Sequence, residues 1–436
     1  MNNLNQFSNI DAALIVDAAN EFGTPLYLYD EKTLLERCGQ CTSMPNPYGL
    51  TVRYAMKANP NRTLLKTIYN AGIQIDASSL NEAIRANLAG VPFKHILLTT
   101  QEVQLGEARA KLEELMLLGL KYNVCSLNQL RLIGDFASTN GMDLGIRIHP
   151  GIGSGESATR NTGDDYSCFG IHLSDIEEAK EYARSKGIKF KHVHEHIGSG
   201  ADSEVWRQCV DLLLKIIEDY FPEAESVSFG GGFKEARMPD EEPVNPTELG
   251  HHAKLRLEEF YAKTGRKLHM ETEPGTYIVA NCGYIITKVV DKKNTSRSNF
   301  VITDGGMEMN SRPLLYGSKH PIYIVSSDGK RLKSSEFCDC SCGSSGEYSA
   351  VVVGKCCESG DCQTLDAEGR TVPRAMTEPE IGDYVVIGGA GAYCSAMAPY
   401  NYNSHVQAAE VLVQLNGEMK LIRRRQTFEQ ILANEV

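Results

Sequence analysis

The sequence lacks several features that would point to particular classes of protein. It has no apolar run long enough to span a bilayer, and residues 1–11 have neither the basic start nor the apolar stretch of a secretory signal. It also has no basic block, and its net charge is −12. These absences argue against a membrane protein, a secreted protein, and a protein whose main partner is nucleic acid or an anionic membrane. We therefore expect a cytoplasmic protein.

Cysteine is present in an odd number, 13, in a chain without a secretory signal. Reduced thiols are therefore expected rather than a disulfide framework. A cluster near the C-terminal end has the spacing Cys-x-Cys-x-Cys, which differs from the usual Cys-x-x-Cys zinc knuckle, and no histidine lies nearby to complete a metal site. We expect no metal there. The cluster consists of Cys338, Cys340, Cys342, Cys356, Cys357 and Cys362.

A length of 436 residues predicts two domains. Strand-like and helix-like segments alternate from about Thr51 to Thr276, and eight βα units in this length favour a (β/α)₈ barrel over an open doubly wound sheet. The predicted strands are Thr51–Ala58, Gly72–Ser78, His95–Thr100, Lys121–Ser126, Asp143–Pro150, Phe190–Gly198, Ser226–Phe233 and Lys267–Glu273.

After Thr276 the chain changes to short strands separated by Gly-, Ser- and Asn-rich turns, which predicts a mostly antiparallel β-barrel or β-sandwich domain. We place the barrel at residues 35–276 and the β domain at 277–436. The β-rich segment Thr24–Tyr29 fits either domain, and we expect residues 1–34 to join the β domain in part. The strands predicted here are Tyr277–Val290, Phe300–Thr303, Ile322–Val325, Tyr348–Val353, Tyr384–Ile387 and Glu410–Gln414.

Reactive groups gather at the C-terminal ends of the predicted barrel strands, where such barrels carry their functional residues. Taken alone, each group has an ordinary explanation. The stem of Lys57 could pack while its ammonium reaches water, His196 could be an interior histidine, and Glu273 could be a salt-bridged glutamate. The groups at these ends are Lys57, Asp76 with Ser78 and Ser79, Arg147, His196 with Gly198 and Ser199, Gly230 to Gly232, and Glu273.

Together these groups predict a site for pyridoxal 5′-phosphate. A lysine buried at a strand end would have the lowered pKa that suits an amine nucleophile. The glycine triplet, a flexible turn in the alternative interpretation, would offer bare backbone amides to a phosphate. A carboxylate at Glu273 would keep the pyridine nitrogen protonated, so that the ring accepts electrons when a bond at Cα breaks.

The chain resembles the alanine-racemase-fold decarboxylases that depend on pyridoxal phosphate, and within them diaminopimelate decarboxylase. The resemblance runs from about Thr24 to Val413, and its most specific part is the run from Cys357 to Asp361. The motifs are Tyr54-Ala55-Met56-Lys57-Ala58-Asn59, Asp76-Ala77-Ser78-Ser79, His196-Ile197-Gly198-Ser199, Gly230-Gly231-Gly232, Glu273-Pro274-Gly275, Arg312-Pro313-Leu314-Leu315-Tyr316-Gly317, Cys357-Glu358-Ser359-Gly360-Asp361 and Gly391-Ala392-Tyr393.

The resemblance implies a homodimer that decarboxylates meso-2,6-diaminopimelate to L-lysine, with Cys357 and Glu358 entering the partner's site. The roles it implies are covalent attachment of the cofactor by Lys57, ring stacking by His196, pairing of Glu273 with the ring nitrogen, phosphate binding by Ser199, Gly230 to Gly232 and Tyr393, proton donation by Cys357, and substrate binding by Arg312, Tyr316, Glu358 and Tyr393. Asp76, Arg147 and Gly275 complete the expected cofactor site.

The chain departs from this family at Thr276, where an arginine that helps to hold the distal carboxylate usually follows Glu-Pro-Gly. The usual proline before the reactive cysteine is also missing, and Gly200 replaces a common glutamine. Decarboxylation of another diamino or modified amino acid, such as ornithine, lysine, or a siderophore or polyamine precursor, therefore stays open. A racemase of the same fold and an inactive binding protein are further alternatives.

Overall fold

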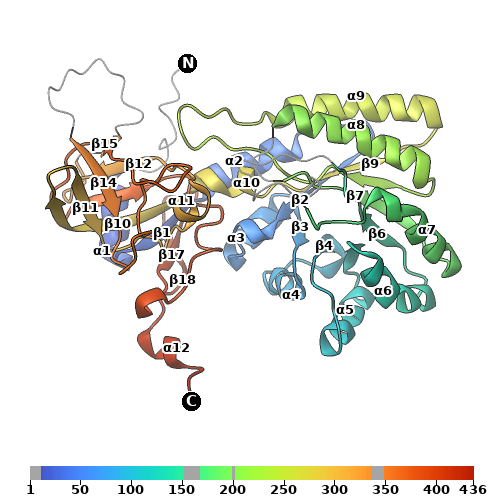
Figure 1. Cartoon of the computed structure of the whole chain (residues 1–436), viewed down its shortest axis with the longest axis horizontal. Coiled ribbons are helices and arrows are strands. Elements are labelled where there is room, and N and C mark those ends of the chain that lie inside the picture. Colours follow the sequence, from blue (N-terminus) through green and yellow to red (C-terminus); the bar gives the residue numbers. More distant parts are fainter. Residues whose placement is uncertain (1–10, 152–166, 199–201, 331, 335–347) are drawn as a thin grey trace. The chain divides into compact units, whose positions relative to one another are not determined.

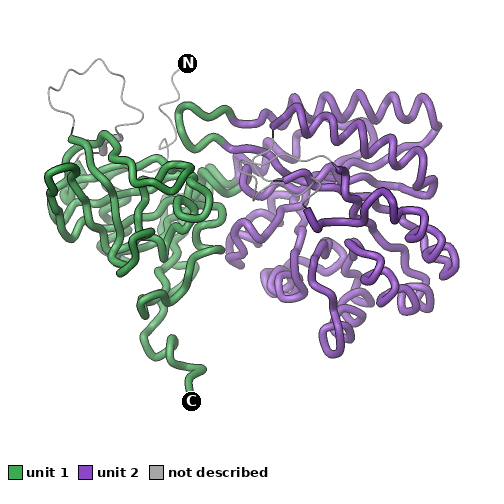
Figure 2. The backbone as a smooth tube through the Cα atoms, in the orientation of Figure 1, with its two compact units in different colours: residues 1–34, 236–242, 279–436 green, residues 35–235, 243–278 purple. Residues whose placement is uncertain are grey.

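A computed structural model describes residues 11–151, 167–198, 202–330, 332–334 and 348–436 of the chain. It divides into two compact units (Figure 2). One unit consists of Leu35–Glu235 and Pro243–Ile278, and the other of Met1–Leu34, Ala236–Glu242 and Val279–Val436. Among the described helices, none has the length and apolar character of a membrane span.

The first unit contains a closed barrel of eight parallel strands, β2 to β9, paired in the order of the chain (Figure 1). This confirms the predicted (β/α)₈ barrel. Each observed strand lies within a predicted one or overlaps it, and most are shorter. The strands are β2 (Leu50–Ala55), β3 (Gln74–Ala77), β4 (Ile96–Thr99), β5 (Lys121–Val124), β6 (Leu144–Arg147), β7 (Phe190–His194), β8 (Ser226–Ser228) and β9 (His269–Thr272).

Helices alternate with these strands, and several begin at a residue whose side chain caps the first turn. Ser79 accepts a hydrogen bond from the N–H of Glu82 at the start of α4, and Ser126 does the same for Gln129 at the start of α6. The helices are α2 (Glu31–Thr42), α3 (Arg62–Asn70), α4 (Leu80–Leu88), α5 (Glu107–Leu117), α6 (Leu127–Thr139), α7 (Ile176–Ser185), α8 (Ser203–Tyr220), α9 (Pro246–Thr264) and α10 (Thr276–Val279).

The interior of the barrel is unusually polar. Successive side chains of a strand point to opposite faces, and charged or polar side chains such as Arg53, His192 and Glu271 line a cavity in the barrel. On β2, for example, Val52 and Tyr54 are buried apolar residues, whereas Arg53 between them pairs with Glu271 of β9. Branched apolar side chains more often fill such barrels. A polar interior has to satisfy its own hydrogen bonds.

The second unit is built on a ten-stranded sheet in which most neighbouring strands are antiparallel. Its main path runs β13-β12-β16-β10-β1-β17-β18, and β11, β14 and β15 branch from β10. The strands are β1 (Leu26–Asp30), β10 (Gly283–Asn294), β11 (Asn299–Thr303), β12 (Ile322–Val325), β13 (Leu332–Ser334), β14 (Ser349–Val353), β15 (Arg374–Ala375), β16 (Tyr384–Ile387), β17 (Ala409–Val413) and β18 (Met419–Arg423).

The early β-rich segment belongs to this sheet. β1 pairs antiparallel with β10 and parallel with β17, and all five of its residues are buried. Helix α1 (Ala12–Phe22), which the sequence analysis did not predict, packs Ile15, Ala18 and Ala19 on the core of the sheet. The prediction of one strand over Tyr277–Val290 is wrong in its first part, because residues up to Val279 form α10 and Ala280–Cys282 form a 3₁₀ helix.

Candidate active site

Lys57 lies just beyond the C-terminal end of β2, in a single 3₁₀ turn (Met56–Ala58). The strand ends at Ala55, whose N–H donates to the carbonyl of Pro274, and the turn closes where Asn59 N–H donates to Met56 O. The predicted strand to Ala58 and the predicted burial of the lysine are therefore both wrong. The turn lifts the side chain out of the packed strand, and Lys57 is exposed.

Glu273 follows β9 and is held inside the barrel by two side chains from neighbouring strands. The Nε2 atom of His194 on β7 lies 2.7 Å from its Oε2, and the hydroxyl of Ser228 on β8 donates to its Oε1 at 2.8 Å. The backbone is fixed as well, because Glu273 N–H donates to the carbonyl of Gly230 at 2.7 Å. Neither His194 nor Ser228 was predicted from the sequence as part of the site.

The two carboxylates at this rim differ in proton affinity. Burial by itself favours the uncharged form of Glu273, but His194 and the Ser228 hydrogen bond outweigh it and lower the pKa. Burial raises the pKa of Asp76, and the negative charge of Glu273 raises it further, while the ammonium of Lys57 acts in the opposite direction. Asp76 therefore binds a proton more readily than Glu273, whose environment favours the ionised form.

His196 is half-buried two residues beyond the end of β7, and its ring is anchored by the N–H of Gly231, which donates to Nδ1 at 3.2 Å. Burial, followed by the positive charges of Lys57 and Arg147, lowers its pKa well below the usual value. The imidazole is therefore a neutral, fixed ring. Arg147 at the end of β6 is buried, with its guanidinium 4.8 Å from the ring centre of Phe169.

The glycine triplet is needed first for packing. A Cβ on Gly230 would lie 2.4 Å from the carbonyl of Glu195, and one on Gly231 would lie 2.3 Å from the carbonyl of Glu273. Gly230 N–H donates to Ser228 Oγ at 3.2 Å, and that of Gly231 donates to His196. Two of the three amides expected to face a phosphate thus have partners inside the protein. The amide of Gly232 has none among the described residues.

Two other predicted cofactor residues, Ser199 and Gly275, follow His196 and Glu273 closely in the sequence. Ser199 falls outside the described residues. Gly275 comes two residues after Glu273, and a Cβ there would lie 3.2–3.3 Å from atoms of Ala55 and Ala58, so the close approach of this segment to the Lys57 turn requires a small residue. In the described part of the barrel unit, Lys57, Asp76, Arg147, His196, Gly230 to Gly232, Glu273 and Gly275 all lie at the C-terminal ends of the strands.

The second unit carries the predicted substrate residues. Arg312, at the start of α11 (Arg312–Tyr316), is fully buried, and it donates from Nε to Nε2 of His320 at 3.2 Å and from a terminal nitrogen to Ser318 Oγ. Tyr316 is half-buried, with its ring centre 5.9 Å from that guanidinium. Tyr393 is half-buried and has a φ of +59°, which is uncommon for a residue with a side chain.

Cys357 and Glu358 are exposed on a turn that two other residues hold in place. Buried Asp361 accepts hydrogen bonds from the N–H groups of Met307 (2.6 Å) and Cys356 (2.7 Å). Asn403, whose φ is +49°, accepts the N–H of Cys357 through Oδ1 at 2.8 Å. These supporting roles of Asp361 and Asn403 were not predicted from the sequence. Backbone strain of this kind is often found at functional sites.

The cysteine cluster is described only in part, because Cys338, Cys340 and Cys342 fall outside the described residues. Cys356 lies 3.4 Å from an oxygen of Glu308 and shares a small polar group with it and Asp361. Cys362 is buried in an apolar cluster with Val351 and Leu365. Every described cysteine is a free thiol.

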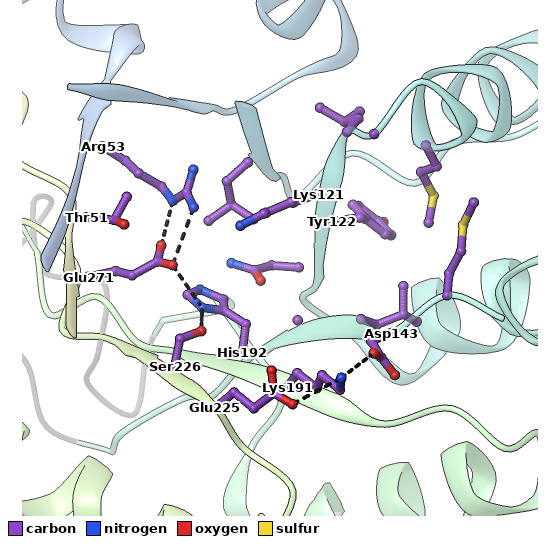
Figure 3. Close-up of a pocket in the computed structure, with 18 of the residues that line it drawn as sticks. Thr51, Arg53, Lys121, Tyr122, Asp143, Lys191, His192, Glu225, Ser226 and Glu271 are labelled. Carbon is purple, nitrogen blue, oxygen red and sulfur yellow. Dashed lines mark hydrogen bonds and ion pairs between the residues drawn. The ribbon is translucent and has the colours of Figure 1, made fainter. Parts of the chain in front are cut away.

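A cavity of about 630 Å³ lies at the opposite, N-terminal end of the barrel (Figure 3). Arg53 pairs there with Glu271, and Lys191 pairs with both Asp143 and Glu225. Both cations therefore have carboxylate partners within the protein. Because barrel enzymes carry their chemistry at the other end, we place the candidate site at the C-terminal rim.

Comparison with known proteins agrees with this geometry. Residues 34–280 match the family described as "Pyridoxal-dependent decarboxylase, pyridoxal binding domain". The chain belongs to this family. It is 31% identical over 420 residues to diaminopimelate decarboxylase of Escherichia coli K12, covering 95% of this chain and 94% of the relative.

Solved structures of decarboxylases are similar to this chain over nearly its full length. One structure of a diaminopimelate decarboxylase is 30% identical to this chain, with a TM-score of 0.87. The match covers 99% of this chain and 98% of the solved one. The M. jannaschii diaminopimelate decarboxylase, solved in complex with L-lysine, is 25% identical with a TM-score of 0.82, covering 97% and 94%. These findings confirm the resemblance drawn from the sequence motifs.

The residues present fit the cofactor that the family name implies. An exposed amine lies at the rim, a neutral imidazole is fixed in orientation, a buried carboxylate is held ionised, and a glycine amide is available to an anion. The buried Oδ1 atom of Asp76 has no hydrogen-bond partner in the described structure, so it can accept one from a bound group. In this decarboxylase, the described barrel rim thus offers the groups that pyridoxal phosphate requires.

Proposed function

We propose that this protein uses pyridoxal 5′-phosphate to decarboxylate meso-2,6-diaminopimelate, giving L-lysine and CO₂. The observation that carries the proposal is the ionised Glu273, held by His194 and Ser228 at the same rim as the Lys57 amine. The diaminopimelate decarboxylases of E. coli and M. jannaschii support the choice of substrate, and the latter was solved with the proposed product, L-lysine.

In this proposal the barrel residues hold the cofactor. Lys57 binds its aldehyde covalently, His196 stacks on the ring, and Glu273 faces the ring nitrogen. Asp76, Arg147 and Gly275 complete the site, while Ser199, Gly230 to Gly232 and Tyr393 receive the phosphate, with Gly232 the glycine amide most open to it. Once bound, the cofactor supplies an electron-accepting ring for the pair released when the carboxylate leaves Cα.

The other unit would recognise the substrate. Arg312 and Tyr316 take the distal carboxylate, to which a guanidinium binds with charge-assisted hydrogen bonds. Glu358 and Tyr393 complete the substrate site, with Glu358 receiving the distal ammonium. Hydrogen bonds from the N–H of Gly360 and the hydroxyl of Ser359 lower the pKa of Glu358, which favours the anionic form for that role. Cys357 delivers a proton to Cα after CO₂ has left.

We further propose a homodimer in which Cys357 and Glu358 act in the site of the partner subunit. Both side chains are exposed on a turn that is fixed from within its own unit by Asp361 and Asn403. A turn of this kind can present reactive groups outward without losing its shape.

The choice of substrate is tested by CO₂ release from a panel containing meso-diaminopimelate, D-lysine, L-lysine and ornithine, with cofactor added. We expect diaminopimelate to be turned over with by far the highest kcat/KM. The second candidate, decarboxylation of another diamino acid, is favoured by Thr276, which stands where the family has an arginine for the distal carboxylate. A clear preference for ornithine would establish that alternative and refute diaminopimelate. Racemisation without CO₂ release would refute both.

A further inference from the structure

Two adjacent strands, β7 and β8, each contribute one group to the carboxylate of Glu273, which follows β9. His194 on β7 approaches one oxygen at 2.7 Å, Ser228 on β8 donates to the other at 2.8 Å, and Gly230 N–H donates to the Ser228 hydroxyl at 3.2 Å. Glu273 is 6% exposed, His194 1% and Ser228 fully buried. At this depth a hydrogen bond has much greater electrostatic weight than at the surface.

The environment of the histidine ring decides where its proton lies. The Nδ1 atom of His194 is buried and has no hydrogen-bond partner in the described structure. A proton on Nδ1 would therefore be a buried donor without an acceptor, which costs free energy. The proton on Nε2, by contrast, has an acceptor, because His194 donates through it to Glu273. Both oxygens of the carboxylate then accept hydrogen bonds, one from His194 and one from Ser228.

We propose that His194 is a positioning residue that, together with Ser228, keeps Glu273 ionised so that the carboxylate holds a proton on the ring nitrogen of bound pyridoxal phosphate. This inference rests on the proposed function, because it requires the cofactor at this rim. Hydrogen bonds to both carboxylate oxygens stabilise the ionised form of Glu273, which can then hold a proton on the ring nitrogen. Without them the carboxylate binds a proton more readily, and the proton moves from the ring nitrogen to Glu273.

His192 provides a matched control. It lies two residues earlier on β7, and its Nδ1 atom is 2.9 Å from Ser226 Oγ and 3.9 Å from an oxygen of Glu271 (Figure 3). It therefore belongs to the polar interior near the N-terminal cavity. A change at His192 perturbs the same strand without removing a donor from Glu273.

The experiment uses the holoenzyme loaded with pyridoxal phosphate that carries ¹⁵N in its ring, and the ¹⁵N chemical shift reports ring protonation. His194→Gln places an amide near the position of Nε2, whereas the shorter His194→Asn places it near Nδ1 and cannot reach Glu273. We expect Asn to lower the ratio of protonated to neutral ring by about 10- to 100-fold, the equivalent of one hydrogen bond to a charged group. The His194→Gln and His192→Gln variants should both keep the wild-type ¹⁵N chemical shift.

A wild-type shift in His194→Asn would overturn the proposal, and so would equal changes in the Gln and Asn variants or in His192→Gln. If neither His194 variant binds the cofactor, Ser228→Ala is measured in the same way. A ¹⁵N chemical shift closer to that of the neutral ring supports the role of the donors, and an unchanged shift refutes it. The measurement needs no substrate. A wild-type protein that binds the cofactor but releases no CO₂ would therefore refute the proposed reaction without touching this inference.

Discussion

Arg53 donates from Nε to Oε2 of Glu271 across 2.6 Å inside the barrel, and the two side chains are only 1% and 5% exposed. A terminal nitrogen of the same guanidinium donates to Gln74 at 2.8 Å. This pair joins the first strand of the barrel to the last, where the sheet closes. Its removal leaves a charge without a partner in the interior.

We expect Arg53→Ala to lower the free energy of unfolding by about 3–5 kcal/mol, the usual cost of leaving one member of a buried pair alone. Urea denaturation followed by circular dichroism measures the change. The exposed pair of Lys111 and Glu114, 2.8 Å apart, is the control, and Lys111→Ala should leave the midpoint unchanged. Equal effects of the two substitutions would show that the interior pair is not a stabilising contact.

The same pair predicts a dependence of stability on pH. Burial by itself raises the pKa of Glu271, but Arg53 and then His192 outweigh it and bring the value to about 2. An unfolded glutamate has a pKa of about 4.3. The ionised Glu271 therefore contributes its full share of the free energy of unfolding above that pH, and this contribution is lost as the pH falls toward 2. The unfolding free energies of wild type and Glu271→Gln should differ by about 3 kcal/mol at pH 7, and about half of that should be gone by pH 3.

Lys57→Ala should abolish nearly all activity and the absorbance band of the bound cofactor, because the covalent attachment is lost. Lys66 on α3 is likewise exposed, and Lys66→Ala should change neither. Absorbance spectra of the purified proteins and CO₂ release measure the two effects. A Lys57→Ala protein with the wild-type spectrum would place the attachment elsewhere.

Cys357→Ala should slow turnover while leaving cofactor absorbance intact, because the proposed role of the thiol is proton delivery. Cys168→Ala, which changes another exposed cysteine, should leave turnover as in wild type. Mixing Lys57→Ala with Cys357→Ala subunits should restore activity, because a mixed dimer regains one complete shared site. If mixing restored nothing although subunits exchanged, the two residues would have to act within a single chain.

Gly230 tests the packing of the rim. Its φ is +63°, and a Cβ would lie 2.4 Å from the Glu195 carbonyl. Gly265 at the end of α9 has a φ of +72° but open space around it. Gly265→Ala should lower the free energy of unfolding by about 1 kcal/mol through backbone strain alone, and Gly230→Ala by about 2–4 kcal/mol because overpacking is added. Equal losses, measured by denaturation, would exclude a steric role for Gly230.

Much of the architecture could be predicted because the outward faces of the barrel strands and the intervening helices follow regular apolar periods. The ends of the strands were harder to predict from the sequence. Nothing local marks Ala55 as the last residue of β2, because its end is set by the Pro274 carbonyl more than 200 residues away. β15 and β18 were missed for a similar reason, since both are short and largely exposed, and long-range pairing defines them.

The candidate site was predicted residue by residue, but its internal support was not. His192, His194 and His196 recur at every second position, which places all three on one face of the extended chain. This spacing is the signal in the sequence that points to His194. The partnership of His194 with Glu273 could not be deduced even so, because it depends on which strands become neighbours when the barrel closes.

The second unit is assembled from three separate stretches of the chain. Its β1 is made early, yet both of its partners, β10 and β17, lie beyond the complete barrel sequence. During synthesis on the ribosome, this apolar strand therefore waits without either neighbour while the whole barrel emerges. An unpaired apolar edge is a template for aggregation. Residues 26–30 of the nascent chain therefore have to be shielded from other chains until its last third has been translated.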